Sequence, residues 1–182
     1  NTAKKIILHE KPDSIEIDFE TTKSALKNTG RIDLLVMEYL PGDEFSTYVF
    51  AEKGKMIYCI SNLRQKLDDY HSFEAKIQNN EKIEIMCRKI IKELELTSNV
   101  NIQFKNSKNK VPKLIEINPR IGGTIILPSI SGINLPYLAI KQCLNEKIPA
   151  IKKSKSTQMI RYTKELFLKD SKFFEINKNL KI

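Results

Sequence analysis

The chain has 182 residues, of which 41% are apolar and 29% are charged. This length and composition fit one globular domain with its own core, or one domain with part of another, and they exclude a disordered or fibrous protein. The formal net charge of +9 raises the question of nucleic-acid binding, but 26 of the 31 basic residues are lysines scattered along the chain. We therefore expect a dispersed lysine-rich surface and no nucleic-acid partner.

Apolar runs in the sequence all fall short of the roughly 18 residues that a membrane-spanning helix needs. The first 20 residues carry charges throughout and contain no apolar signal-peptide core. Cys59, Cys87 and Cys143 are odd in number and widely spaced, which favours buried, reduced thiols over a disulfide framework or a zinc site. We expect a cytoplasmic protein without a membrane partner.

The first half of the chain is expected to change from weakly patterned segments to β structure. Residues 5–9 predict a strand, and residues 18–29 predict a short helix that Gly30 ends. Residues 33–63 contain three apolar, β-prone runs separated by turn residues, starting with a strand over 33–40. This spacing predicts a three-stranded antiparallel meander, and the polar residues 64–79 that follow are expected to be irregular.

The second half predicts two helices and another hairpin. Residues 80–96 carry an apolar stripe at helical spacing. Residues 99–106 and 111–118 flank a polar turn and predict two antiparallel strands, after which residues 134–145 predict a second apolar-striped helix with a proline in its first turn. A closing strand is expected over 157–163, and the tail beyond 170 is weakly specified. The stripe of the first helix consists of Ile83, Met86, Cys87, Ile90 and Leu94.

These elements predict an α+β fold, with an antiparallel sheet backed by the two helices. The second hairpin carries the most informative side chains. Period-2 alternation places Asn101 and Gln103 on one face of their strand, and Glu116 and Asn118 share a face of the next. A turn near Asn109 would put Gln103 opposite Glu116 and Asn101 opposite Asn118. One carboxylate among several amide oxygens suits a hard cation such as Mg²⁺ bound beside nucleotide phosphates.

Arg120 follows two residues after Asn118 and would lie on the same side if the strand continued. A guanidinium beside a metal-bound triphosphate can stabilise the charge of a phosphoryl group in transfer. A solvent-exposed sheet face would show the same alternation. The pattern alone is therefore compatible both with a metal site and with an ordinary exposed face.

The string P-K-L-I-E-I-N-P-R-I-G-G-T at 112–124, together with N-I-Q-F at 101–104, closely resembles the C-terminal core of ATP-grasp enzymes. The likeness is greatest to the large chain of carbamoyl phosphate synthase and its stand-alone relatives. The resemblance implies that Gln103, Glu116 and Asn118 bind two Mg²⁺ ions, with Mn²⁺ as an alternative. It also implies that Arg120 is the catalytic residue, in contact with the terminal phosphate of ATP.

A second string, V-M-E-Y-L-P-G-D-E at 36–44, resembles the hinge strand of the same family. The resemblance implies that Glu38, Tyr39 and Leu40 line the adenine, where backbone groups match its adjacent donor and acceptor, and that Glu44 binds the ribose hydroxyls. Edge-strand charges beside a Pro-Gly turn would give the same string, so this motif depends on its occurrence with the first.

The resemblance implies an ATP-grasp C-terminal subdomain preceded by part of the central subdomain. We expect residues 1–32 to belong to the central subdomain, residues 33–168 to form the nucleotide- and metal-binding subdomain, and residues 169–182 to form a tail. The chain starts at Asn1, and the family's phosphate-binding lysine and glycine-rich loop are not recognisable before Gly30. We therefore expect a piece of a longer enzyme that is inactive or nearly so by itself.

The expected activity is that of an ATP-dependent carboxylate–amine ligase that works through an acyl phosphate, with ATP, a small carboxylate and an amine as substrates and a homodimer as one candidate assembly. The alternatives are a subunit of the carbamoyl phosphate synthase type and a non-catalytic nucleotide-binding module.

Arg64 and Lys76 fall in the segment expected to be irregular, where a solvated loop charge is a commoner role than a phosphate contact.

Overall fold

The computed structural model describes Lys27 and residues 37–68, 71–151, 154–162, 166–169 and 172–174. Contacts divide the chain into two units, Asn1–Glu38 and Tyr39–Ile182. The strand expected at 5–9 lies outside the described residues, and of the helix expected at 18–29 only Lys27 is described, in helical conformation. The fold described below is that of the second unit.

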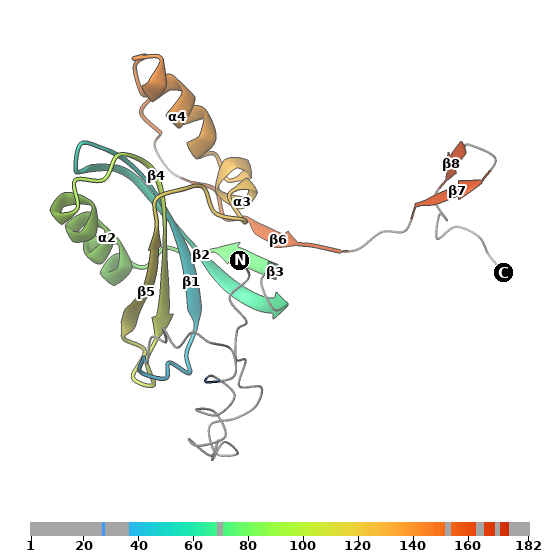
Figure 1. Ribbon diagram of the computed structural model, residues 1–182, viewed down its shortest axis with the longest axis horizontal. Coiled ribbons are helices and arrows are strands. Elements are labelled where there is room, and N and C mark those ends of the chain that lie inside the picture. The colour runs from blue at the N-terminus through green and yellow to red at the C-terminus, as the bar shows by residue number, and fades with distance from the viewer. Residues whose placement is uncertain are drawn as a thin grey trace. The chain divides into compact units, whose positions relative to one another are not determined.

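Six strands form one antiparallel sheet in the order β5-β4-β1-β2-β3-β6 (Figure 1). The turn between β1 and β2 is made by Lys53 and Gly54, which both have positive φ, the conformation that a tight hairpin turn needs. The candidate functional residues described below come from four neighbouring strands, β5, β4, β1 and β2. The strands are β1 (Glu44–Glu52), β2 (Lys55–Asp68), β3 (His71–Ile77), β4 (Ser98–Asn106), β5 (Pro112–Asn118) and β6 (Gln158–Ile160).

The two longer helices of the second unit, unlike a short helix between them, begin at asparagine side-chain caps. Helix α2 (Glu81–Glu93) starts at Asn80, whose side chain accepts hydrogen bonds from two backbone N–H groups of the first turn. Helix α4 (Leu135–Cys143) starts at Asn134 in the same way. A short helix, α3 (Ile126–Ile130), precedes it. A separate two-stranded sheet contains β7 (Phe167–Lys169) and β8 (Lys172–Phe174). None of the described helices is long and apolar enough to cross a membrane.

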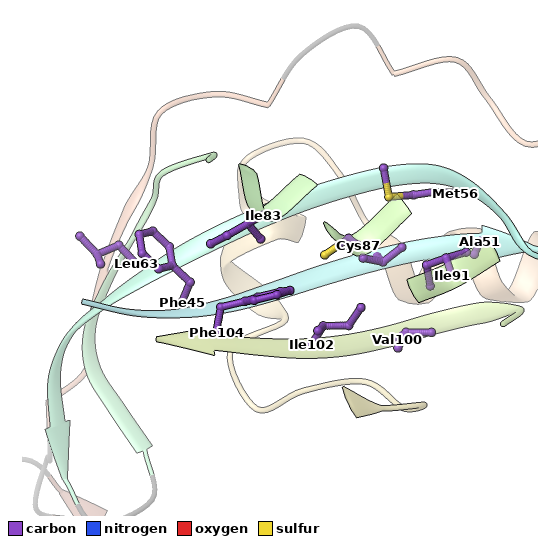
Figure 2. Close-up of a cluster of buried hydrophobic side chains, with 11 residues drawn as sticks. Phe45, Ala51, Met56, Leu63, Ile83, Cys87, Ile91, Val100, Ile102 and Phe104 are labelled. Atoms are coloured by element: carbon purple, nitrogen blue, oxygen red, sulfur yellow. The ribbon is translucent and has the colours of Figure 1, made fainter. Parts of the chain in front are cut away.

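The sheet is packed on both faces. On one face, α2 covers alternate residues of β1 and β4, and Figure 2 shows its inward side chains along the sheet, from Ile83 near Phe45 to Ile91 near Ala51. On the other face, Tyr48, Phe50 and Ile60 form a second cluster with residues on and just before α4. Both clusters are built by the period-2 alternation of the strands, which sends successive side chains to opposite faces. The second cluster also contains Ile133, Leu135 and Leu138.

The expected α+β sheet with helices is confirmed, and so are the two helices at 80–96 and 134–145 and the hairpin at 99–118. Residues 64–79 were expected to be irregular, which is wrong: β2 runs on to Asp68 and pairs with β3. The prediction of a strand over 33–40 is also wrong for the part that the structure describes, because residues 37–40 have no strand conformation. A strand needs a hydrogen-bonded neighbour, and both edges of β1 are already taken by β2 and β4.

The buried stripe of α2 differs from the expected one at Leu94, which was included in it, and at Ile91, which was not. Leu94 lies at the C-cap of α2 and is 54% exposed, whereas Ile91 is fully buried. All three cysteines are free thiols, as expected, although Cys143 is exposed rather than buried. The pKa of Cys87 is raised well above its ordinary value by a hydrogen bond with the Cys59 thiol and by burial, so Cys87 is a protonated core residue.

Candidate functional site

The sheet face that carries α4 changes from apolar to polar along β1. Tyr48 and Phe50 belong to the buried cluster, while Ser46 and Glu44 lie two and four residues further toward the start of the strand. Because residues that are paired across neighbouring strands share a face, the strand register defines three rows on this face. We call this part of the sheet the polar face. Its rows are Asn118–Asn101–Tyr48–Ile60, Glu116–Gln103–Ser46–Asn62 and Lys105–Glu44–Arg64.

The middle row contains Gln103 and Glu116, and the adjacent row contains Asn118, the third residue expected to bind metal. Gln103 is paired with Glu116 and Asn101 with Asn118, so the register predicted from the sequence is confirmed. The Gln103 amide Nε2 donates to Glu116 Oε1 at 2.5 Å, and Asn118 Nδ2 donates to the same oxygen at 2.7 Å. Glu116 is exposed, and the two amides are half-buried. The structure thus brings the three side chains together around one accessible carboxylate.

This donor set fits a hard divalent cation. A carboxylate and two amide oxygens are ligands that Mg²⁺ accepts beside phosphate and water. An amide group presents oxygen instead of nitrogen after a half-turn of its terminal torsion, so Gln103 and Asn118 can supply oxygen without movement of the backbone. In the described part of the chain, no cluster of three or more His, Cys, Asp or Glu offers another metal site. The assignment of these residues as metal ligands remains a prediction.

The position of the row is fixed by the core on the opposite face. Ile102 and Phe104 flank Gln103 in β4 and are fully buried under α2, which forces Gln103 to the polar face. In β5, Ile117 packs against the same core. The register shifts between Gln103 and Phe104, which leaves Ile115 without a direct partner. This irregularity interrupts the strict alternation of β5 directly before Glu116, while Glu116, Ile117 and Asn118 are regularly paired.

Asn101 lies on the same face as Gln103, as the alternation predicted, but its side chain is buried. Its side chain is 2% exposed, and its Nδ2 donates to Ser46 Oγ at 2.8 Å and to the Thr47 carbonyl at 3.4 Å. A buried amide must satisfy its donors inside the protein, and the neighbouring strand β1 supplies these acceptors. Asn101 therefore ties β4 to β1 beneath the site.

Arg120 lies beyond the end of the strand, so the condition for its placement on the same side as Asn118, that the strand continues, is not met. Strand β5 ends at Asn118, and the chain bends with a 2.7 Å hydrogen bond from the Arg120 N–H to the Asn118 carbonyl. Pro119 explains the break, because proline has no N–H to donate to the sheet. The exposed guanidinium donates to the Ile121 carbonyl at 3.0 Å. Its catalytic role remains a prediction.

The loop that follows Arg120 is anchored on the buried part of the sheet. The Tyr48 hydroxyl lies 2.5 Å from Thr124 Oγ1 and accepts a hydrogen bond from the Thr124 N–H at 3.1 Å. Gly122 is buried against Asn101 and Tyr48: a Cβ added there would lie 2.9 Å from Asn101 Cγ and 2.9 Å from Tyr48 Cε1. The glycine is needed here for close approach, since its φ is not in the left-handed region.

We expect the Gly122→Ala substitution to destabilise the fold by about 1–3 kcal/mol, because the added methyl group would overpack a site formed by two buried side chains. Gly123→Ala is the matched control, since nothing lies within 4 Å of a Cβ at that position. Urea unfolding of both variants measures the difference. Equal stability of the two variants would contradict this close packing.

Glu44, expected to bind ribose, lies in the row next to Glu116 and Gln103. It forms an ion pair with Arg64 on β2, and the side chains of both residues are 15% exposed. Lys105 on β4 places its Nζ 3.8 Å from the other carboxylate oxygen of Glu44. Arg64 is thus a strand residue within a charged cluster, and its assignment to a solvated loop was wrong. Only the pairing of β1 with β2 and β4 reveals this cluster, since 20 residues separate Arg64 from Glu44 in the sequence.

The remaining residues of the expected hinge, Glu38, Tyr39 and Leu40, precede β1. Glu38 is exposed and belongs to the first unit of the chain. Tyr39 is 64% exposed and Leu40 is buried, both in a segment without regular secondary structure. The following turn is joined to the end of β4 by a 2.9 Å hydrogen bond from the Gly42 N–H to the Asn106 carbonyl. Adenine binding by Glu38, Tyr39 and Leu40 remains a prediction.

Several solved structures share this fold at low sequence identity. The biotin carboxylase domain of 2-oxoglutarate carboxylase from Hydrogenobacter thermophilus, in complex with MgADP and bicarbonate, matches with a TM-score of 0.57 and 20% identity, over 76% of this chain and 32% of that one. Biotin carboxylase from Campylobacter jejuni, in a β,γ-ATP complex, matches with a TM-score of 0.55 and 17% identity, over 78% and 34%.

N5-carboxyaminoimidazole synthase from Aspergillus clavatus, in complex with ADP and 5-aminoimidazole ribonucleotide, matches with a TM-score of 0.51 and 14% identity, over 62% of this chain and 32% of that one. The chain therefore spans about a third of the length of these structures. At this level of identity the similarity establishes the fold alone. No curated protein matches the sequence.

A family model described as "ATP-grasp in the biosynthetic pathway with Ter operon" matches residues 31–166. This range contains the polar face, the expected hinge string at 36–44 and the closing strand β6. The match covers most of the chain, and we conclude that the protein belongs to the ATP-grasp family.

Proposed function

We propose that this chain is the ATP- and Mg²⁺-binding portion of an ATP-dependent ligase that joins a carboxylate to an amine. The observation that carries the proposal is the convergence of the Gln103 and Asn118 amides on the exposed carboxylate of Glu116. Family membership supports nucleotide binding. Because the chain spans about a third of the compared structures, we assign to it nucleotide and metal binding and not the recognition of the other substrates.

Glu116, Gln103 and Asn118 would hold Mg²⁺. When bound, the cation would neutralise part of the negative charge on the β- and γ-phosphates of ATP. Arg120 has an exposed guanidinium whose single described hydrogen bond is to a neighbouring carbonyl, so it can exchange that contact for a phosphate oxygen. Glu44 lies one row, about 7 Å along the strands, and two strands, roughly 10 Å across the sheet, from Glu116, a separation that an extended nucleotide and the two side chains can span together. A nucleotide with its γ-phosphate at Glu116 can therefore extend its ribose toward Glu44.

The proposed reaction has two steps. A carboxylate oxygen of the substrate attacks the γ-phosphorus of ATP, the bond from this phosphorus to the β,γ-bridging oxygen breaks, and ADP leaves. The nitrogen of the amine then attacks the carbonyl carbon of the acyl phosphate, inorganic phosphate leaves with the electrons of the carbon–oxygen bond, and the nitrogen loses a proton. Arg120 would stabilise the negative charge on the phosphoryl group during the first step.

Isothermal titration calorimetry on the 182-residue chain tests the nucleotide-binding part of this proposal. We expect ATP to bind in the presence of Mg²⁺ and to bind much more weakly when EDTA removes the metal, because the carboxylate of Glu116 would otherwise face the phosphates without a cation between them. Binding that is equally strong with EDTA would contradict metal-dependent recognition. The absence of binding under both conditions would contradict the proposed function.

A further inference from the structure

Arg64 lies in a charged cluster that the family resemblance did not assign. Three neighbouring strands each contribute one member: Lys105 from β4, Glu44 from β1 and Arg64 from β2, in one row of the polar face. The Arg64 guanidinium donates from Nη1 to Glu44 Oε1, and Lys105 Nζ lies 3.8 Å from Glu44 Oε2. Two cations therefore flank one carboxylate, each facing a different oxygen.

The burial of this pair distinguishes it from an ordinary surface ion pair. The side chains of Arg64 and Glu44 are each 15% exposed, whereas the pair formed by Arg88 and Glu84 on α2 is 61% and 49% exposed. Largely desolvated charges interact more strongly and hold a more definite geometry than exposed ones. The planar guanidinium adds direction to this contact, because its N–H groups are fixed in one plane.

We propose that Arg64 is a positioning residue for Glu44: it fixes the carboxylate so that its remaining lone pairs can accept hydrogen bonds from the two ribose hydroxyls of a bound nucleotide. A carboxylate has about four acceptor sites, and the described contacts with Arg64 and Lys105 leave room for two hydroxyl groups. Discrimination between ribose and a sugar without hydroxyls depends on a pre-placed acceptor. This inference rests on the proposed nucleotide-binding function.

The test compares calorimetric dissociation constants for MgATP and for the Mg²⁺ complex of 2′,3′-dideoxy-ATP, which lacks both hydroxyls. We expect the unaltered chain to prefer ATP. Arg64→Gln should weaken ATP binding by about tenfold, in line with loss of a hydrogen bond to a charged group, and should leave binding of the dideoxy nucleotide nearly unchanged. The preference for ATP should therefore largely disappear.

Arg88→Gln is the matched control, because it removes an arginine from an ion pair on the opposite face and should keep the preference. Arg64→Lys retains the positive charge without the planar fork and should give an intermediate preference, which keeps the test valid if Arg64→Gln folds poorly. A purely structural role would leave the ratio of the two dissociation constants unchanged in both Arg64 variants, and that result would overturn the inference. If the unaltered chain bound neither nucleotide, the proposed function would fail together with the inference about Arg64.

Discussion

Replacement of Glu116 with glutamine is expected to lower the affinity of the chain for MgATP by at least about 10- to 100-fold. Residues that only form hydrogen bonds to a metal ligand typically change metal affinity by about 10- to 100-fold when they are replaced. Glu116 is expected to be a ligand itself, and it is the single carboxylate among the three expected ligands. The substitution keeps the size of the side chain but removes the negative charge that attracts the cation. Because Glu116 is exposed, the stability of the fold should change little.

Calorimetry at a fixed Mg²⁺ concentration measures this effect, and urea unfolding verifies that the variant is folded. Glu93→Gln at the end of α2 is the control, since it removes the same charge from an exposed position on the other side of the sheet. If Glu116→Gln and Glu93→Gln bound MgATP equally well, Glu116 could not be a metal ligand.

Truncation of Ile91 to alanine is expected to destabilise the fold by about 2–5 kcal/mol, the usual cost when a large aliphatic side chain is removed from a core. Ile91 is fully buried between α2 and the sheet (Figure 2). Leu94→Ala provides the control three residues later, because Leu94 is 54% exposed and its truncation should change the free energy of unfolding by well under 1 kcal/mol.

Urea denaturation at constant pH gives both values. A similar loss of stability in the two variants would show that the helix packs with a different stripe toward the sheet. The prediction also bears on the site, since α2 buries the residues that force Gln103 onto the polar face.

The hairpin that carries the site could be predicted from the sequence in register as well as in position. One face of β4 and β5 is apolar and the other polar, so a slip of one residue would bury Gln103 and expose Phe104. The two strands are also close in sequence, which limits the ways in which they can pair. This combination explains why the facing positions of Gln103 and Glu116 were predicted correctly.

Other elements have weaker secondary-structure signals in the sequence. The end of β2 and the whole of β3 contain many charged residues, which resemble a loop in composition although they pair regularly in the sheet. Helix α3 is only five residues long and contains Pro128, so it lacks a measurable helical period. Pro119 did carry a signal, and the strand predicted over 111–118 ends where β5 ends, directly before this proline.

The charged cluster of Arg64, Glu44 and Lys105 could not be predicted from the sequence, because each contact joins residues far apart in the chain. Its members are brought together by the antiparallel pairing of β1 with β2 and with β4. Glu44 was expected to bind the ribose, with no partner assigned to it. The structure instead places it between two cations, and this arrangement suggested a role for Arg64.

The most direct test of the site is a crystal structure of the chain with ADP and Mn²⁺, a substitute for Mg²⁺ that anomalous scattering locates unambiguously. We predict a metal peak at coordination distance from the Glu116 carboxylate, with the side-chain oxygens of Gln103 and Asn118 turned toward it and the diphosphate adjacent. A Mn²⁺–nucleotide complex bound elsewhere, with Glu116 still hydrogen-bonded to both amides, would contradict the account.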